Sequence, residues 1–229
     1  MAQFHFVEDY ERHVNELVSQ HPLDEAMSLA VGGGYELIGD IASQIVVYAG
    51  AKSGMDVFDF GCGSGRVAHA LAKKVDLKSF LGTDIVQPLL DYAKTKTPDH
   101  YRFVKHQALS VPAPDESFDI TYAFSVFTHL LQAECYIYLQ DIARVLKPRG
   151  TFVFSFLELS EGAHWGIFQN TVDTQRALQA PHLNMFIERS QIKIWAKHAG
   201  FKVTEIIDGP SKRWNGHALG QTVAILKKH

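Results

Sequence analysis

Apolar and polar residues follow two different periods along most of the chain after Met55. Short apolar runs predict strands over 55–60, 79–84, 101–105, 118–124, 151–157, 201–207 and 219–226. Apolar residues at helical spacing predict helices over 64–73, 87–94, 133–146 and 190–197. This alternation predicts an α/β fold with a doubly wound, mostly parallel sheet and helices on both faces. Such sheets bind ligands beyond the carboxyl ends of their strands.

Two segments fall outside this alternation. Residues 1–50 predict an N-terminal helical cap, with an amphipathic helix over 7–20, three glycines at 32–34 and a second helix over 36–49. The glycines form either a flexible joint or a backbone wall beside a ligand. Residues 158–187 have no clear period and are interpreted as a lid or substrate insertion. We therefore expect one domain over 1–229, with a cofactor-binding core at 51–157 and a C-terminal helix and strands at 188–229.

The first predicted strand runs directly into a turn with three alternating glycines, Val57-Phe58-Asp59-Phe60-Gly61-Cys62-Gly63-Ser64-Gly65-Arg66. Glycines let the backbone approach a ligand closely, and the start of the next helix offers unpaired N–H groups. The dinucleotide fingerprint has its third glycine where Arg66 stands, which disfavours NAD. Asp59 would repel a pyrophosphate but suits a cation. S-adenosylmethionine, which carries an ammonium and a sulfonium group, therefore fits the turn better.

A second carboxylate ends the next predicted strand. Asp84 follows the glycine turn by about 20 residues, the separation at which such folds bind ribose hydroxyls. A carboxylate can accept two hydroxyl hydrogen bonds. Asp59 and Asp84 together predict a seat for a positively charged adenosine derivative at one edge of the sheet.

Composition and charge limit the possible binding partners and the cellular compartment of the protein. The 229-residue chain has a formal net charge of -3 and therefore no overall basic field for a nucleic acid. Cys62 and Cys135 have neither metal-ligand spacing nor a secreted-type pattern, which favours a reducing cytoplasm. The N-terminus lacks the apolar core of a signal peptide, and Asp40 and Gln44 interrupt the longest apolar region. We expect an unprocessed, cytoplasmic protein without a membrane segment.

Several ordered motifs between Gly32 and Lys228 resemble the class I S-adenosylmethionine-dependent methyltransferases. The glycine turn resembles the first motif of that family, and Asp84 resembles its ribose-binding acid. Two segments resemble the entry to the fourth strand and the turn before the fifth, Val111-Pro112-Ala113-Pro114-Asp115-Glu116-Ser117-Phe118-Asp119 and Arg144-Val145-Leu146-Lys147-Pro148-Arg149-Gly150. The resemblance implies a seven-stranded sheet with an antiparallel last strand, for which Gln221-Thr222-Val223-Ala224-Ile225-Leu226 is the candidate. It also implies S-adenosylmethionine as the cofactor and S-adenosylhomocysteine as its product.

The residues expected to hold the cofactor follow the carboxyl ends of the first four predicted strands: Asp59, Phe60, Gly61, Cys62, Gly63, Gly65, Arg66, Asp84, Ile85, Gln107, Ala108, Leu109, Phe124 and Ser125. Gln107 stands where the family usually has an adenine-contacting carboxylate, so its amide oxygen would accept from the adenine amino group. Arg66 is expected near the carboxylate of the ligand, although a surface arginine would look the same in the sequence. Arg149 replaces the commoner first glycine of its turn, which affects backbone conformation more than chemistry.

His129 and His164 are the candidate catalytic bases for an acceptor that keeps its proton. His129 follows the fourth predicted strand, where a packed structural histidine is the alternative. His164 and Trp165 could stack on the acceptor and remove its proton, or could be ordinary loop residues. Tyr35 is a further candidate substrate contact, with His129, His164 and Trp165. The histidines lack metal-ligand spacing, so no metal is expected.

We predict a methyltransferase that moves the sulfonium methyl group to a small-molecule acceptor, with oxygen as the favoured acceptor atom. Phe124-Ser125-Val126-Phe127 follows the fourth strand in place of an Asp-Pro-Pro-Tyr-type sequence, which disfavours the acceptors of nucleic-acid methyltransferases. The alternatives are a protein or RNA methyltransferase with a local docking patch, a non-catalytic S-adenosylmethionine-binding module and, more remotely, an NAD-dependent oxidoreductase. A monomer and a homodimer both stay open.

Overall fold

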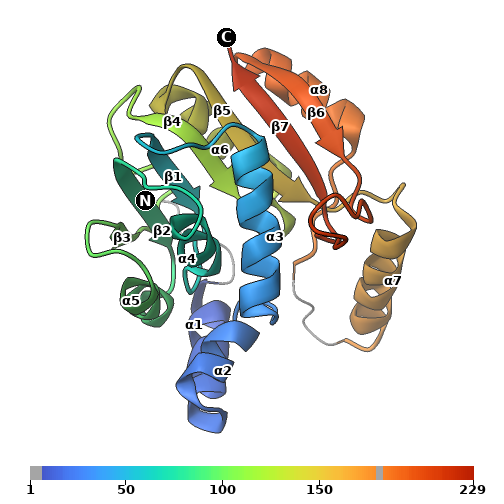
Figure 1. Ribbon diagram of the computed structural model, residues 1–229. Helices are drawn as coiled ribbons and strands as arrows, with labels where there is room; N and C mark the ends of the chain where they lie inside the picture. Colours follow the sequence, from blue (N-terminus) through green and yellow to red (C-terminus); the bar gives the residue numbers. More distant parts are fainter. Residues whose placement is uncertain (1–6, 179–182) are drawn as a thin grey trace.

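The computed structural model describes residues 7–178 and 183–229, in which seven strands form one sheet in the order β3-β2-β1-β4-β5-β7-β6 (Figure 1). The strands are β1 (Asp56–Phe60), β2 (Ser79–Asp84), β3 (Arg102–Lys105), β4 (Phe118–Ala123), β5 (Leu146–Phe156), β6 (Phe201–Ile207) and β7 (Thr222–Lys228). Pairing is parallel from β3 to β5, whereas β7 is antiparallel to both β5 and β6. The predicted fold class and the antiparallel last strand are confirmed.

The helices of the described residues are α1 (Val7–Gln20), α2 (Leu23–Leu29), α3 (Tyr35–Tyr48), α4 (Arg66–Ala72), α5 (Gln87–Lys96), α6 (Gln132–Val145), α7 (Gly162–Arg176) and α8 (Arg189–His198), with a short 3-10 helix, η1 (Phe127–His129). Most lie where helical spacing predicts them, with ends displaced by a few residues. None of the helices within residues 7–178 and 183–229 is long and apolar enough to cross a membrane.

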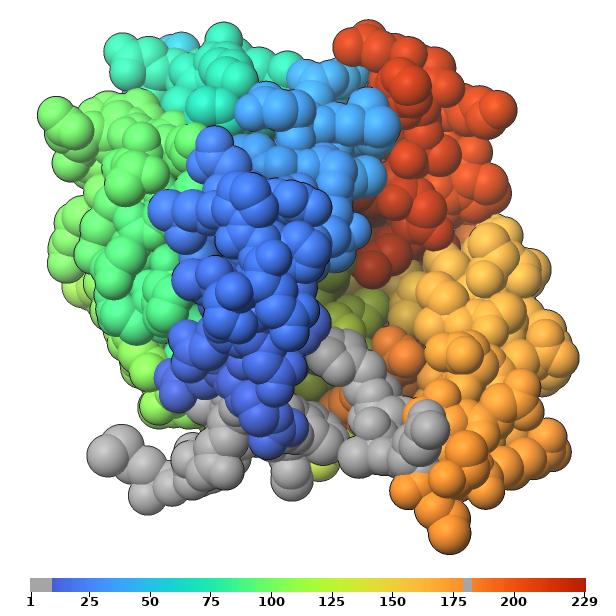
Figure 2. Space-filling model, turned by 90° about the horizontal axis from the view of Figure 1, so that it is seen from below, coloured from blue at the N-terminus to red at the C-terminus, as the bar shows by residue number. Residues whose placement is uncertain are grey.

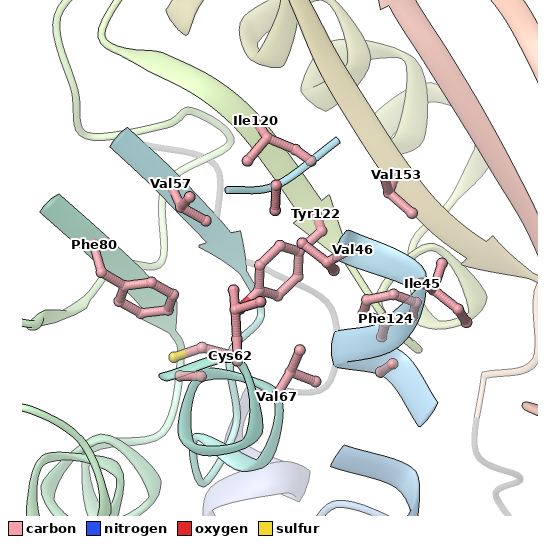
Figure 3. Packing of buried hydrophobic residues seen from close by; sticks show 14 of the residues in the cluster. Ile45, Val46, Val57, Cys62, Val67, Phe80, Ile120, Tyr122, Phe124 and Val153 are labelled. Atoms are coloured by element: carbon pink, nitrogen blue, oxygen red, sulfur yellow. The ribbon is translucent and has the colours of Figure 1, made fainter. Parts of the chain in front are cut away.

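Helices cover both faces of the sheet because its strands are apolar on both sides. On one face, Ile45 of α3 and Val67 of α4 pack in the same buried cluster as Val57 of β1 (Figure 3). On the other face, Tyr138 of α6 and Ile192 of α8 share a cluster with the phenylalanines of β1 and β5. Each fully buried side chain of this size stabilises the fold by about 1.5–3 kcal/mol relative to exposure. The two layers hold the carboxyl ends of the parallel strands in fixed positions.

The N-terminal cap differs from the prediction in one respect. Only α1 and α2 lie beyond the carboxyl ends of the strands, whereas α3 packs along the sheet (Figure 1). Helix α3 buries Ile41 and Ile45, whereas Leu37 and Tyr48 are 47% and 54% exposed. The cap attaches through a small cluster in which Val14 and Met27 pack against residues of α5.

The segment over 158–187 contains a helix rather than an irregular loop. Helix α7 gives no helical period because it buries little of its surface: His164 is its buried residue, and Trp165 is 46% exposed. Residues 179–182 of this segment lie outside the described residues. Strand β5 also begins earlier than predicted, at Leu146, and its pairing with β4 shifts register between Phe118 and Ile120.

Candidate functional site

A cavity of about 470 Å³ lies beyond the carboxyl ends of β1, β2 and β4. Figure 2 views this end of the molecule, where the N-terminal helices lie across the sheet on one side and α7 stands on the other. The cavity's position agrees with the rule for open parallel sheets. Its size is within the range of about 300–1,000 Å³ found for small-molecule sites.

The turn after β1 forms one wall of the cavity through backbone that only glycine adopts easily. Gly61, Gly63 and Gly65 have φ angles of 71°, 54° and 78°. A Cβ atom on Gly63 would lie 2.7 Å from Val31 Cγ1, and one on Gly65 would lie 2.7 Å from Ala93 Cβ. The alternating glycines are therefore required both by the left-handed backbone and by close packing.

Asp84 joins the ends of the first two strands. Its Oδ2 accepts the Gly63 N–H at 2.8 Å, and its Oδ1 accepts the Val86 N–H at 3.1 Å. Burial raises the pKa of the Asp84 carboxyl, and the backbone N–H groups offset part of this rise. Each oxygen has a second acceptor site, so the carboxylate can still accept hydroxyl groups from a ligand.

Asp59 is the least satisfied polar group of the site. The residue is 2% exposed, and its Oδ2 has no hydrogen-bond partner among the described residues. Burial raises the pKa of the Asp59 carboxyl well above its usual value; the neighbouring Tyr122 hydroxyl offsets part of this rise, and the charge of Asp84 adds to it. A buried carboxylate oxygen without a partner is costly, so this site favours a positively charged occupant.

Arg66 begins α4 and lines the same cavity. Its Nη1 donates to the Gly33 carbonyl at 3.1 Å, and burial lowers the pKa of the guanidinium to about 10. The cavity therefore holds a carboxylate at Asp59 and a cation at Arg66. A zwitterionic amino-acid group, with one ammonium and one carboxylate, complements this pair of charges.

The cap completes the cavity. Tyr10 and His13 of α1 line it, as does backbone from Leu29 to Gly32. The segment is tied to the glycine turn by Ser64 Oγ, which donates to the Met27 carbonyl at 3.0 Å. Of the three glycines, Gly32 lines the cavity, which agrees with the backbone-wall interpretation at that position.

The structure brings most of the predicted cofactor residues together. The predicted residues that line the cavity are Asp59, Phe60, Gly61, Cys62, Gly63, Arg66, Asp84, Ile85, Phe124, Ser125 and His129. Gly65, Gln107, Ala108 and Leu109 do not line it. Gln107 Nε2 donates to the Ile85 carbonyl at 3.3 Å, and the Ala108 carbonyl accepts from Tyr138. His106, one residue before Gln107, faces the cavity instead.

His129 lies in η1 at the tip of β4 and lines the cavity. Its Nδ1 is 2.8 Å from the Leu183 carbonyl, and the Tyr10 ring meets it edge-on at 5.9 Å between centroids. A carbonyl only accepts hydrogen bonds, so Nδ1 carries the proton. In the neutral ring the lone pair is then on Nε2.

The other predicted substrate residues lie elsewhere, and this corrects the expectation for them. His164 is 1% exposed and outside the cavity lining; its Nε2 lies 2.8 Å from the Gly220 carbonyl, and its Nδ1 accepts the Glu158 N–H at 3.1 Å. Both ring nitrogens of a neutral imidazole are thereby satisfied. Trp165 is half exposed and packs against Phe168 in a tilted arrangement, with 5.2 Å between ring centroids. Tyr35 does not line the cavity and donates its hydroxyl to the Ser64 carbonyl at 3.1 Å.

Sequence reasoning missed several lining residues, notably Tyr10, His13, His106 and Gln221. Tyr10 and His13 are one helical turn apart, so they share a face of α1, but nothing in the sequence shows which face turns toward the sheet. Gln221 directly precedes β7, and the sequence predicts it only as the start of a strand. No local motif marks it.

Comparison with known proteins agrees with this geometry. A methyltransferase-domain family matches residues 58–154, which include the glycine turn, Asp84 and β4. The structure of magnesium protoporphyrin IX methyltransferase from Synechocystis, with bound S-adenosylhomocysteine, has a TM-score of 0.67 over 98% of this chain and 96% of that one, at 17% identity. Residues 58–154 thus match a methyltransferase domain, and the fold of the chain is that of the class I S-adenosylmethionine-dependent methyltransferases.

Curated relatives of this chain differ in the acceptor that their names specify. A sterol 24-C-methyltransferase from Aspergillus fumigatus is 36% identical over 107 residues, which cover 45% of this chain and 28% of the relative. A ubiquinone biosynthesis O-methyltransferase from Stutzerimonas stutzeri is 26% identical over 162 residues, or 68% of each chain. The matched part of the chain spans about a third or less of the sterol enzymes that it resembles. These likenesses leave the acceptor and its methylated atom open.

Proposed function

We propose that the protein binds S-adenosylmethionine in the cavity and transfers its methyl group to a small-molecule acceptor, with S-adenosylhomocysteine as the product. The observation that carries the proposal is the buried Asp59 carboxylate, whose Oδ2 lacks a partner among the described residues. An ammonium group beside Asp59 would remove the cost of that unpaired charge. The methyltransferase-domain family that residues 58–154 match supports the same ligand.

The other groups of the cavity fit the rest of that ligand. The remaining acceptor sites of Asp84 would hold ribose hydroxyls, and the Arg66 guanidinium would pair with the amino-acid carboxylate. At the adenine end we retain Ile85, Gln107, Ala108 and Leu109 as proposed contacts. Gln107 uses its Nε2 on the Ile85 carbonyl, so Oε1 is the atom that would accept the adenine amino group.

The bound cofactor supplies an activated methyl group, so the work of the chain is to orient the acceptor and exclude water. Tyr10 and His13 cover the cavity from α1, on the side away from the sheet. Well-oriented pairs gain several kcal/mol from positioning, on the order of 7–11 in the best cases. In this proposal the N-terminal cap, through α1, encloses the acceptor and the core at 51–157 holds the cofactor; none of the described residues of 158–187 lines the cavity.

His129 is the proposed catalytic base. The Leu183 carbonyl holds the Nδ1 proton, so Nε2 is the nitrogen that would take a proton from the acceptor. Such a base is useful for a hydroxyl, which keeps its proton at neutral pH. This supports oxygen as the acceptor atom.

The direct test is transfer of a trideuterated methyl group from labelled S-adenosylmethionine into pooled metabolite fractions, followed by mass spectrometry. We expect a labelled product that requires the protein, and we expect Asp59→Asn to reduce its formation at least tenfold, roughly the effect of losing one charged hydrogen bond. Asp91→Asn, an exposed change on α5, is the matched control. Binding of S-adenosylhomocysteine without transfer to any fraction would instead support a non-catalytic binding module.

A further inference from the structure

Gln221 reaches the cavity because β7 runs against the other central strands. The parallel strands point their carboxyl ends at the site, whereas antiparallel β7 places its amino end there. Gln221 immediately precedes Thr222, the first residue of β7, and it lines the cavity together with Ser125 at the tip of β4. The residue therefore contributes a side-chain amide to the ligand space from the far end of the sequence.

Two serines determine how this amide is oriented. Ser155 Oγ accepts the Ser125 N–H at 2.8 Å, so its own hydrogen is available to donate to Gln221 Oε1, which lies 2.6 Å away. Ser125 Oγ lies 3.3 Å from the same oxygen. Both lone pairs of Oε1 are thus occupied on the side of β4 and β5. The two N–H groups of Nε2 therefore point away from the two serines.

The backbone that carries Gln221 is held as firmly as its side chain. His164 Nε2 donates to the Gly220 carbonyl at 2.8 Å, and the Gly220 N–H donates to the Gly209 carbonyl at 3.0 Å. Ser125, which contacts the amide, has a φ of 58°, a strained conformation for a residue other than glycine. Strain of this kind persists where the surrounding structure fixes a functional geometry. His164 is accordingly a positioning residue for Gln221.

We propose that the Nε2 group of Gln221 holds a carbonyl or carboxylate oxygen of the methyl acceptor, and that Ser125 and Ser155 fix the amide for this task. The proposal rests on the function proposed above and narrows its substrate class. Apolar side chains of Phe124, Val126 and Leu130 line the same cavity, so the rest of the acceptor is apolar. The class that fits is a hydroxylated acid or carbonyl compound on an apolar body.

The test uses the three isomers of hydroxybenzoate as probes and phenol as their counterpart without the carboxylate. Each is titrated by calorimetry into the full chain saturated with S-adenosylhomocysteine. We expect at least one isomer to bind at least tenfold tighter than phenol, about the effect of one charge-assisted hydrogen bond. Equal binding of all four probes, or binding of none, would overturn the proposal.

Two variants connect this preference to the amide. Gln221→Glu keeps an oxygen for the serine hydroxyls but replaces the N–H donors with a carboxylate, so the preference for hydroxybenzoate should vanish while phenol binding is unchanged. Ser155→Ala removes the hydroxyl that fixes the amide and should weaken hydroxybenzoate binding severalfold. Its affinity for hydroxybenzoate should lie between that of the wild-type protein and that of Gln221→Glu. Gln140→Glu, the same change at an exposed position of α6, is the control and should behave as the wild type. Retention of the preference in Gln221→Glu would contradict the assignment.

Failure of this inference can be separated from failure of the proposed function. Binding of S-adenosylhomocysteine is measured first for every variant, and we expect each dissociation constant to stay within twofold of the wild type, because Asp59, Asp84 and Arg66 are unchanged. A chain that does not bind S-adenosylhomocysteine contradicts the proposed function. A chain that binds it but does not distinguish hydroxybenzoate from phenol contradicts only the role of Gln221.

Discussion

Gly63 and Asp84 are joined by a hydrogen bond of 2.8 Å from the backbone N–H of the glycine to the carboxylate of the acid. The bond connects the turn after β1 to the end of β2, two strands that lie side by side. It fixes the position of Asp84 before any ligand arrives. Preorganisation of this kind lowers the cost of ordering groups on binding.

Replacement of Asp84 by alanine should therefore affect both stability and cofactor binding. The Gly63 and Val86 N–H groups would lose their acceptor, at a cost of about 1–3 kcal/mol in the free energy of unfolding. Denaturant titration measures this loss, and calorimetry should show at least a tenfold weaker affinity for S-adenosylhomocysteine, on the order of one lost charged hydrogen bond. Asp91→Ala, an exposed change on α5, should alter neither quantity. Wild-type affinity in Asp84→Ala would remove this carboxylate from the proposed site.

The packing of the glycine turn can be tested at Gly65. An alanine would meet Ala93 and would hold a φ of 78°, so we expect a loss of about 2–4 kcal/mol in the free energy of unfolding. Gly162→Ala is the control, because the added methyl group would have no atom within 4 Å and the backbone of Gly162 is not left-handed. That change should be neutral or stabilising by up to about 1 kcal/mol. Equal denaturation midpoints for the two variants would show that the turn is not strained.

Local motifs allowed much of this site to be predicted from the sequence. Asp59, Gly63 and Asp84 belong to strand ends whose geometry depends on near neighbours in the chain and on the pairing of β1 with β2. Tyr10 and Gln221 could not be found in this way. Their positions depend on how α1 packs over the sheet and on the reversed direction of β7.

His164 shows why a residue type alone does not reveal a role. It has the same imidazole as His129, yet its function is decided by a carbonyl 56 residues away, at Gly220. Helix α7 was missed for a related reason. Because His164 is the one buried residue of α7, the sequence of this helix has no apolar stripe.

Cofactor affinity should depend on pH through Asp59. Burial raises the pKa of this carboxyl in the unliganded protein, and a bound ammonium group would lower it again. Binding should then release protons, and affinity should be greatest above the raised pKa and should decline as the pH falls through it. Calorimetry of S-adenosylhomocysteine binding in buffers with different ionisation enthalpies measures the proton release. Asp84 also has a raised pKa, so Asp59→Asn is needed to isolate the effect and should flatten the pH dependence. If the affinity of Asp59→Asn changes with pH as steeply as that of the wild type, Asp59 is not the source of the pH dependence.

Replacement of His129 should lower turnover far more than it weakens cofactor binding. With an acceptor identified by the labelled-methyl screen, His129→Ala should lower kcat by about 10²–10⁴-fold, the usual contribution of a general base. The dissociation constant of S-adenosylhomocysteine should stay within about twofold, since a missing proton acceptor does not disturb the charges that bind the cofactor. His100→Ala, an exposed change before β3, provides the control. Undiminished turnover in His129→Ala would assign the residue a packing role.

The most direct measurement is calorimetric titration of the purified full chain with S-adenosylmethionine, S-adenosylhomocysteine and NAD in parallel. We predict one-to-one binding of both adenosine derivatives, with dissociation constants of about 1 mM or tighter, the upper range of enzyme–substrate affinities. NAD should give no heat of binding, because Asp59 repels its pyrophosphate and Arg66 occupies the place of the third glycine. Binding of NAD without binding of either adenosine derivative would contradict the account.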